Sequence, residues 1–296
     1  FKFLEQEDNS LIKNCFLTYN HTKNPYITLF NYLLLKQELE KKNYNIKFSN
    51  HSSVMNYLFK KRKKFPIVLE SFYLKNNFIR SVKDKIKSIF FNLKNQKFDI
   101  SKKFYAINNE AVLENEYLKR DKHWTEIVSF QTLINEKINK KIKPDDYNFS
   151  QLQKRINLLH NKYLAFAKKK LKINIPEFVN LDILHYQYEY YRKIYILLNN
   201  LANNKKIKDC SKFFLDAPKT YIRAISCLVR GNRGKAVGVP HGSWISPTIS
   251  KRTHYNEFLV YNEFIVSNKS QIPLFKDNLK NFSNNIKINF LTADSK

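Results

Sequence analysis

One short stretch of the chain gathers the residue types that could support a reaction. All glycines of the 296-residue sequence lie in this stretch: Gly231, Gly234, Gly238 and Gly242. Glycine is required where the backbone adopts a positive φ or approaches another group closely. One of the seven histidines, His241, directly precedes the last of these glycines. We therefore expect the functional site in or beside residues 231–242.

His241 is the candidate catalytic residue, because an imidazole titrates near neutral pH and can act as a general base or contact a phosphate. Residues 235–239 predict a strand, Pro240 restricts the chain after it, and Gly242 permits a tight turn. Ligands of α/β proteins bind beyond the carboxyl ends of parallel strands. This places His241 at a ligand crevice, with a structural loop histidine as the alternative.

Other polar residues near His241 could bind an anionic substrate. Arg252 and His254 lie on the following loop and could reach a phosphate or an acceptor hydroxyl group. Ser267 or Asn268 is expected to cap a helix over 269–281, whose first N–H groups would form an anion site. Asp216 and Trp244 are weaker candidates, for which helix capping and loop packing are the alternatives.

The elements around these residues predict an α/β fold. Strands at 213–216 and 235–239 flank a helix over 219–230, a spacing that implies parallel strands and a right-handed crossover. Gly231 is expected to end that helix as its C′ residue. Further strands are expected at 258–261, 264–266 and 286–291.

The first two thirds of the chain are expected to be mainly helical, with a helix over 26–42, short strands at 66–70 and 103–107, and helices through most of 109–202. Tyr188, Tyr191 and Tyr195 would share one helical face, which favours packing over stacking on a base or sugar. His160 lies in mid-helix without any site context and is not expected to serve the site.

Residues 74–95 predict an amphipathic helix with one apolar and one basic face. Its apolar stripe has two interpretations: packing on the core, which we favour, or lying on an anionic membrane. The apolar residues of the stripe are Phe78, Val82, Ile86, Ile89, Phe90 and Leu93.

The composition bounds the class of protein. The net charge is +28, but 44 lysines accompany only 9 arginines, a bias that AT-rich coding also produces. The favoured interpretation of this charge is a generally solvated basic surface, followed by binding to an anionic membrane or a phosphorylated substrate. Nucleic acid is the disfavoured partner, because nucleic-acid readers favour arginine. No P-loop, GxGxxG, HExxH, metal cluster or paired-cysteine motif occurs, and no apolar run is long enough to span a bilayer.

Two segments carry a resemblance to a known family. Residues 237–243 (VGVPHGS) and 254–268 (HYNEFLVYNEFIVSN) resemble the N-terminal domain of GT-B type glycosyltransferases of bacterial surface and capsular polysaccharide synthesis. They are also similar to CDP-glycerol glycerophosphotransferases. In these families a strand ending in His-Gly opens a loop into the interdomain cleft, and a later strand ends in a small polar residue. The resemblance implies a catalytic or phosphate-contacting His241, and substrate-binding roles for Gly242, Ser243, Ser267 and Asn268.

The resemblance implies one Rossmann-like, acceptor-side domain over 1–296, with a helical insertion at about 109–205. The donor-binding domain would lie beyond Lys296, and we expect a fragment that lacks both ends. The implied function is transfer of a sugar from a nucleotide sugar to a glycan or lipid-linked acceptor, without a cofactor or metal. The expected location is the cytoplasm, with peripheral attachment to the inner face of the plasma membrane. The alternatives are a polyol-phosphate transferase, or a non-catalytic basic protein that binds nucleic acid or membrane.

Overall fold

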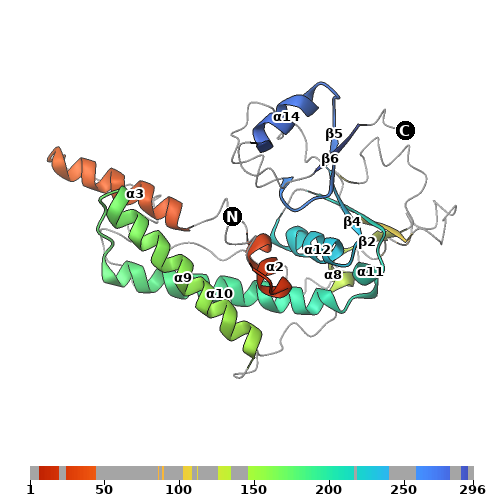
Figure 1. The fold of residues 1–296 in the computed structure, drawn as a ribbon, viewed down its shortest axis with the longest axis horizontal. Helices are drawn as coiled ribbons and strands as arrows, with labels where there is room; N and C mark the ends of the chain where they lie inside the picture. The colour runs from red at the N-terminus through yellow and green to blue at the C-terminus, as the bar shows by residue number, and fades with distance from the viewer. Residues whose placement is uncertain are drawn as a thin grey trace. The chain divides into compact units, whose positions relative to one another are not determined.

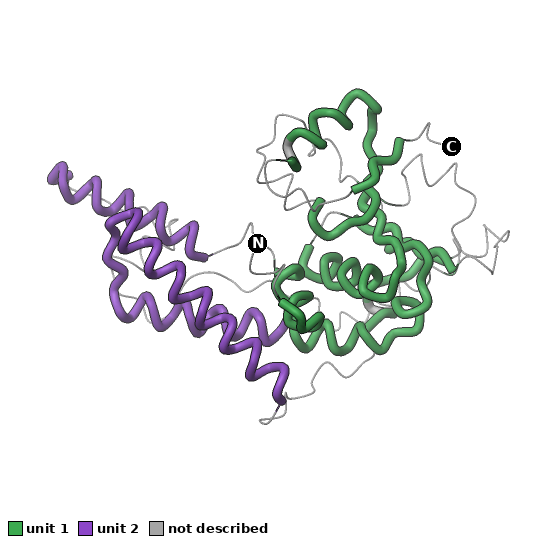
Figure 2. The backbone as a smooth tube through the Cα atoms, viewed as in Figure 1, with its two compact units in different colours: residues 1–22, 72–141, 194–296 green, residues 23–71, 142–193 purple. Residues whose placement is uncertain are grey.

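The computed structural model describes somewhat more than half of the chain, in two compact units (Figure 2). Unit 1 comprises residues 1–22, 72–141 and 194–296, and unit 2 comprises residues 23–71 and 142–193. The described residues are 7–19, 25–44, 86, 89, 103–108, 112, 126–134, 146–216, 219–239, 258–280 and 288–292.

Unit 1 contains a six-stranded sheet in which every pair of neighbouring strands is parallel (Figure 1). The strand order is β2-β1-β3-β4-β5-β6. This confirms the expected α/β class with an open parallel sheet. The strands are β1 (Phe104–Ile107), β2 (Glu126–Val128), β3 (Lys212–Leu215), β4 (Lys235–Gly238), β5 (Glu263–Val266) and β6 (Asn289–Thr292).

The central strands are apolar along their length because both faces of the sheet are covered. Three consecutive residues of β3, 213–215, are fully buried, and all four residues of β5 are buried. A strand with one wet face would alternate apolar and polar residues, whereas a parallel strand between helix layers does not. The register pairs Lys212 with Lys235 and Leu215 with Gly238, so β3 and β4 end at the same edge.

Helix α12 (Thr220–Gly231) connects β3 to β4 and packs against both strands. Its other main partner is α2 (Ser10–Thr18), which begins at Asn9, whose side chain accepts hydrogen bonds from the N–H groups of Leu11 and Ile12. Arg223 of α12 is buried, and its Nε donates to the Leu17 carbonyl at 3.0 Å. A guanidinium at this place stabilises α2, because the carboxyl end of a helix carries partial negative charge.

Helix α12 ends in a different way from the sequence prediction. Gly231 is its last residue, and the residue with positive φ is Arg233, at φ 67°. The Gly234 N–H bonds to the Val229 carbonyl and the Arg233 N–H to the Arg230 carbonyl. This is a Schellman motif, so Arg233 takes the C′ position that the sequence assigned to Gly231.

Two strand predictions also differ from the structure. The sequence does not predict β2, which pairs with β1 at the edge of the sheet. The predicted strand at 258–261 is a turn, and the strand begins only at Glu263. The turn remains apolar because the ring of Phe258 packs edge-on against those of Phe264, Phe275 and Phe290, with centroid distances of 4.7 to 5.6 Å.

Side chains of α12 bind the carbonyl groups that this turn cannot pair within a strand. The Ser226 hydroxyl donates to the Val260 carbonyl, and the Arg230 guanidinium donates to the Leu259 carbonyl at 2.8 Å. A buried carbonyl without a partner would cost about 1–3 kcal/mol, so these two donors allow the apolar turn to be buried.

Unit 2 is built from α3 (Pro25–Lys41), α9 (Tyr147–Lys170) and the first part of α10 (Glu177–Ala202). The core includes Leu29 and Leu33 of α3, as expected, with Ile183 of α10. Helices α9 and α10 are separated at Pro176, since 172–176 form no regular structure. Along α10, Tyr191 and Tyr195 are buried, which confirms packing for these two tyrosines. Tyr188 is only half-buried, and its hydroxyl donates to Oδ1 of Asn157 at 2.5 Å.

A buried polar trio within unit 2 gives His160 a structural role. The His160 side chain is only 4% exposed, and its Nδ1 lies 2.5 Å from the Tyr26 hydroxyl. Its Nε2 bonds to Oδ1 of Asn180. Since that amide oxygen can only accept, Nε2 carries the proton and Nδ1 accepts from Tyr26. His160 is therefore a structural residue that joins the three helices of unit 2.

This trio predicts that the protein loses stability in mild acid. Burial lowers the pKa of His160 below its usual value near 6.5, although the bond to Asn180 acts in the other direction. Below that value the unfolded chain binds a proton before the folded chain does, so the free energy of unfolding falls as the pH falls. Neighbouring phenols do not offset this, because burial raises the pKa of Tyr26 and keeps it neutral, with the nearby phenols of Tyr163 and Tyr188 acting in the same direction.

Urea unfolding between about pH 7 and about pH 5 measures this effect, since the range brackets the ordinary histidine pKa. The control is His160→Gln, whose amide cannot titrate. We expect a steeper loss of stability with acid in the wild type than in the variant. Equal slopes would show that His160 does not contribute.

Several expectations concern residues with little or no description. The predicted strand at 66–70 lies outside the described residues. Of the helix predicted at 74–95, Ile86 and Ile89 are described and helical, and their side chains are 47% and 56% exposed. The favoured interpretation, packing on the core, is therefore wrong for these two side chains. Within the described part of the chain, no helix is long and apolar enough to cross a membrane.

Candidate functional site at the carboxyl edge of the sheet

The strand order defines where an open parallel sheet binds a ligand. From β1 the chain moves to β2 on one side, whereas β3, β4, β5 and β6 follow one another on the other side. Connections that leave in opposite directions open a crevice beyond the carboxyl ends of the two strands between them. Among the described strands this switch point lies between β1 and β3, one strand away from β4, which precedes His241.

Asn108 and Asp216 follow the two strands of the switch point. The Asn108 N–H bonds to the Val128 carbonyl of β2 at 2.7 Å, which holds the end of β1 against its neighbour. Asp216 is fully buried, and its main-chain carbonyl accepts a hydrogen bond from the Tyr261 hydroxyl at 2.5 Å. Tyr261 thus ties the end of β3 to the turn before β5.

Helix α12 begins at this same edge. Its first residue, Thr220, is 2% exposed, and the side chain of the N-cap residue Lys219 makes no capping bond. Helix N-termini carry partial positive charge and N–H groups without partners inside the helix. Together with Asp216, the switch point combines a carboxyl group, a helix N-terminus and a lysine.

Strand β4 leads from the sheet toward the predicted catalytic residue. The Val239 N–H still bonds to the Leu215 carbonyl at 2.8 Å, so the chain remains aligned with β3 up to this residue. Pro240 and His241 follow at once in the sequence. His241, Gly242, Ser243, Arg252 and His254 lie outside the described residues, as does Trp244, and the roles assigned to them stay predictions.

Two of the three glycines before His241 lie where a larger side chain would not fit. A Cβ atom on Gly238 would lie 2.5 Å from a ring carbon of Phe264 and 2.6 Å from one of Tyr261. A Cβ atom on Gly234 would lie 2.5 Å from the Cys210 carbonyl oxygen. Close approach, one of the two reasons for glycine given by the sequence, therefore explains both positions, while nothing lies within 4 Å of a Cβ added at Gly231.

Ser267 and Asn268 follow β5 at the same edge and are exposed. The Oδ1 atom of Asn268 accepts a hydrogen bond from the Ser270 N–H at 2.9 Å, and its carbonyl accepts from the Gln271 N–H. Asn268 thus shapes the turn that leads into α14 (Gln271–Lys280), close to the expected start of this helix. The substrate-binding roles of Ser267 and Asn268 stay predictions.

The opposite, amino edge of the sheet is occupied by ion pairs. Glu263, 6% exposed at its side chain, lies 2.8 Å from Lys235 Nζ and 3.3 Å from Lys212 Nζ. Lys235 is the first residue of β4, so it lies at the amino edge, away from the crevice. These lysines neutralise a buried carboxylate and do not face the carboxyl edge.

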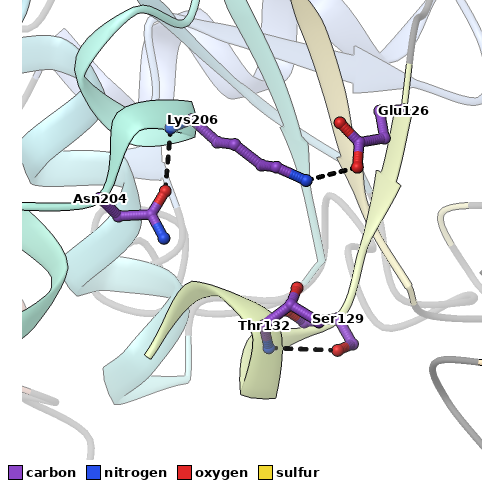
Figure 3. A network of polar contacts seen from close by, with 5 residues as sticks. All are labelled: Glu126, Ser129, Thr132, Asn204 and Lys206. Atoms are coloured by element: carbon purple, nitrogen blue, oxygen red, sulfur yellow. Dashed lines mark hydrogen bonds and ion pairs between the residues drawn. The ribbon is translucent and has the colours of Figure 1, made fainter. Parts of the chain in front are cut away.

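A second polar network surrounds β2 and α8 (Phe130–Leu133) (Figure 3). Lys206 of α11 (Lys205–Lys208) forms an ion pair with Glu126, at the start of β2. Asn204 caps α11 by accepting from the Lys206 N–H at 2.9 Å, and it donates to the Leu133 carbonyl. Ser129 accepts from the Thr132 N–H at 3.3 Å and caps α8. These bonds fix the edge strand whose position creates the switch point.

Sequence reasoning missed the contribution of β1 and β2 to this site. Asn108 and Ser129 were not singled out, because the switch point exists only once β2 pairs with β1. Within the described part of the chain, no three His, Cys, Asp or Glu side chains are grouped to hold a metal ion. No family model, no curated protein and no solved structure matches the chain.

Proposed function

We propose that the chain is the acceptor-side part of a GT-B type glycosyltransferase, which moves a sugar from a nucleotide-activated donor to a cell-surface glycan or lipid-linked acceptor. One observation carries the proposal: β4 of an all-parallel sheet runs into Pro240-His241-Gly242, next to the switch point between β1 and β3. The resemblance of 237–243 and 254–268 to this class of enzyme supports the same function.

The reaction assigns a role to each group. His241 accepts the proton of the acceptor hydroxyl group, whose oxygen then forms a bond to the anomeric carbon of the donor sugar. The bond from that carbon to the donor phosphate breaks, and the nucleotide leaves with the electron pair. The negative charge that develops on the phosphate would be stabilised by Arg252, by His254 and by the N–H groups of the turn at Asn268 that leads into α14.

A polyol-phosphate transferase is the second candidate, because the same histidine would serve an attack on phosphorus. The two differ in the bond that breaks, and therefore in the leaving group. A non-catalytic basic protein is the third candidate, and the net charge of +28 favours it. Such a binder would show an affinity that falls steeply with salt and no turnover.

The test is a turnover assay of the full-length protein with a panel of nucleotide sugars and CDP-glycerol, using lipid-linked glycan acceptors. We expect acceptor-dependent release of nucleotide from one class of nucleotide sugar. Release from CDP-glycerol alone would favour the second candidate. Absence of turnover with every donor, together with salt-sensitive binding to polyanions, would contradict the proposal.

A further inference from the structure

Helix α9 of unit 2 carries a large share of basic residues without any acid. Residues 147–176 contain no Asp or Glu. In contrast, the part of α10 in unit 2 carries Glu177, Asp182 and Glu189. The basic residues of 147–176 are Lys154, Arg155, Lys162, Lys168, Lys169, Lys170 and Lys172.

Part of this charge forms a stripe along the exposed side of α9, which we call the α9 stripe. Its five residues, named at the end of this paragraph, follow one another at spacings of seven, four, four and seven residues. At these spacings they share one face of the helix. All are exposed, and the face opposite carries the buried Leu152, Ile156 and His160. The stripe consists of Tyr147, Lys154, Leu158, Lys162 and Lys169.

The stripe combines charge with apolar surface. Leu158, which is 40% exposed, lies between Lys154 and Lys162. The side chain of Tyr147, at the start of the stripe, is 71% exposed. Within the described ranges, no carboxylate forms an ion pair with Lys154, Lys162 or Lys169. Lysines beside exposed apolar side chains suit an anionic lipid surface, because the ammonium groups can stay in water while the lysine stems and the apolar side chains cover apolar surface.

We propose that the α9 stripe docks unit 2 on an anionic lipid surface. The lysines would lie among the lipid phosphates, and Tyr147 and Leu158 would enter the boundary between headgroups and acyl chains. Helix α9 is 24 residues long, so the stripe extends over about 30 Å and contacts several headgroups at once. The proposal does not depend on the proposed reaction.

Simpler explanations account for only part of this pattern. Lysines in the last turn of a helix stabilise its carboxyl end, which explains Lys168, Lys169 and Lys170. That effect fades within one turn, so it does not explain Lys154 or Lys162. Nucleic acid is the less suitable partner, because Arg155 is the only arginine of α9 and arginine is preferred at phosphate and base contacts.

The test is co-sedimentation of the full-length protein with vesicles, at low salt, with the triple variant Lys154→Gln, Lys162→Gln, Lys169→Gln. The wild type is expected to bind phosphatidylglycerol vesicles and not pure phosphatidylcholine vesicles. Each lysine at an anionic surface contributes about 1 kcal/mol, so the triple variant should bind on the order of 100-fold more weakly. Leu158→Gln should weaken binding as well, because it removes apolar contact.

The matched control removes the same number of charges elsewhere: Lys42→Gln, Lys208→Gln and Lys276→Gln, at three exposed positions. This control variant should bind nearly as well as the wild type. Equal losses in the two triple variants would show that only net charge matters, and would overturn the proposal. Binding to neutral vesicles equal to that on anionic ones would overturn it too, as would tighter binding to RNA than to vesicles at the same salt.

Discussion

Replacement of His241 by alanine is expected to lower the proposed glycosyl-transfer turnover of the full-length protein at least ~100-fold, the scale of a general acid–base group. The residue follows β4, whose carboxyl end lies beside the switch point of the sheet. From the sequence, Pro240 is expected to restrict the chain after β4 and Gly242 to permit a tight turn. The loss should fall on kcat more than on KM, because the proton transfer belongs to the transition state.

The control is His185→Ala, since His185 is exposed on α10 and belongs to neither the sheet edge nor the buried trio of unit 2. His160 is unsuitable as a control, because its imidazole bonds to Tyr26 and Asn180. Turnover near the wild-type value in a folded His241→Ala protein would show that His241 only anchors a loop.

The glycines should respond to alanine in opposite directions. Gly238→Ala places a methyl group within 2.8 Å of ring carbons of Tyr261 and Phe264, both buried. Overpacking a core costs about 1–3 kcal/mol, and we expect about 3 kcal/mol because both rings are held on other elements. Gly231→Ala meets no atom within 4 Å and should leave stability unchanged or raise it by up to about 1 kcal/mol.

Urea unfolding of the two variants measures this difference. Gly231 is the matched control, because it ends α12 only seven residues before Gly238 and the chemical change is the same. Gly238→Ala as stable as the wild type would show that the packing of Tyr261 and Phe264 does not require glycine. A large loss for Gly231→Ala would contradict the open surroundings of that residue.

The C-terminal third could be predicted because local pattern and tertiary fold agree there. The predicted strands at 213–216 and 235–239 lie on either side of a predicted amphipathic helix. The structure has β3, α12 and β4 in the same order within a residue or two of these bounds. The turn at Phe258 could not be predicted, because its apolar residues are buried by ring packing and by donors from Ser226 and Arg230. These donors come from a helix distant in sequence.

Long-range pairing explains the other differences. β2 has only three residues and is defined by its ladder to β1, so its own sequence carries little signal. The switch point depends on that ladder and was therefore missed. The polar role of His160 was missed because its partners, Tyr26 and Asn180, come from other helices that are distant in sequence. The residues of the predicted site that follow Val239 remain predictions from sequence.

A ligand site at the carboxyl edge of the sheet is tested most directly by hydrogen exchange of the full-length protein, with and without the proposed nucleotide-sugar donor and glycan acceptor, read by mass spectrometry. We expect bound substrates to slow amide exchange in peptides that cover 214–222 and 238–242, which include the carboxyl ends of β3 and β4. Peptides of the amino edge around Lys235 and Glu263 should not change. Protection confined to the amino edge or to unit 2, with substrates that turn over, would contradict a site at the carboxyl edge.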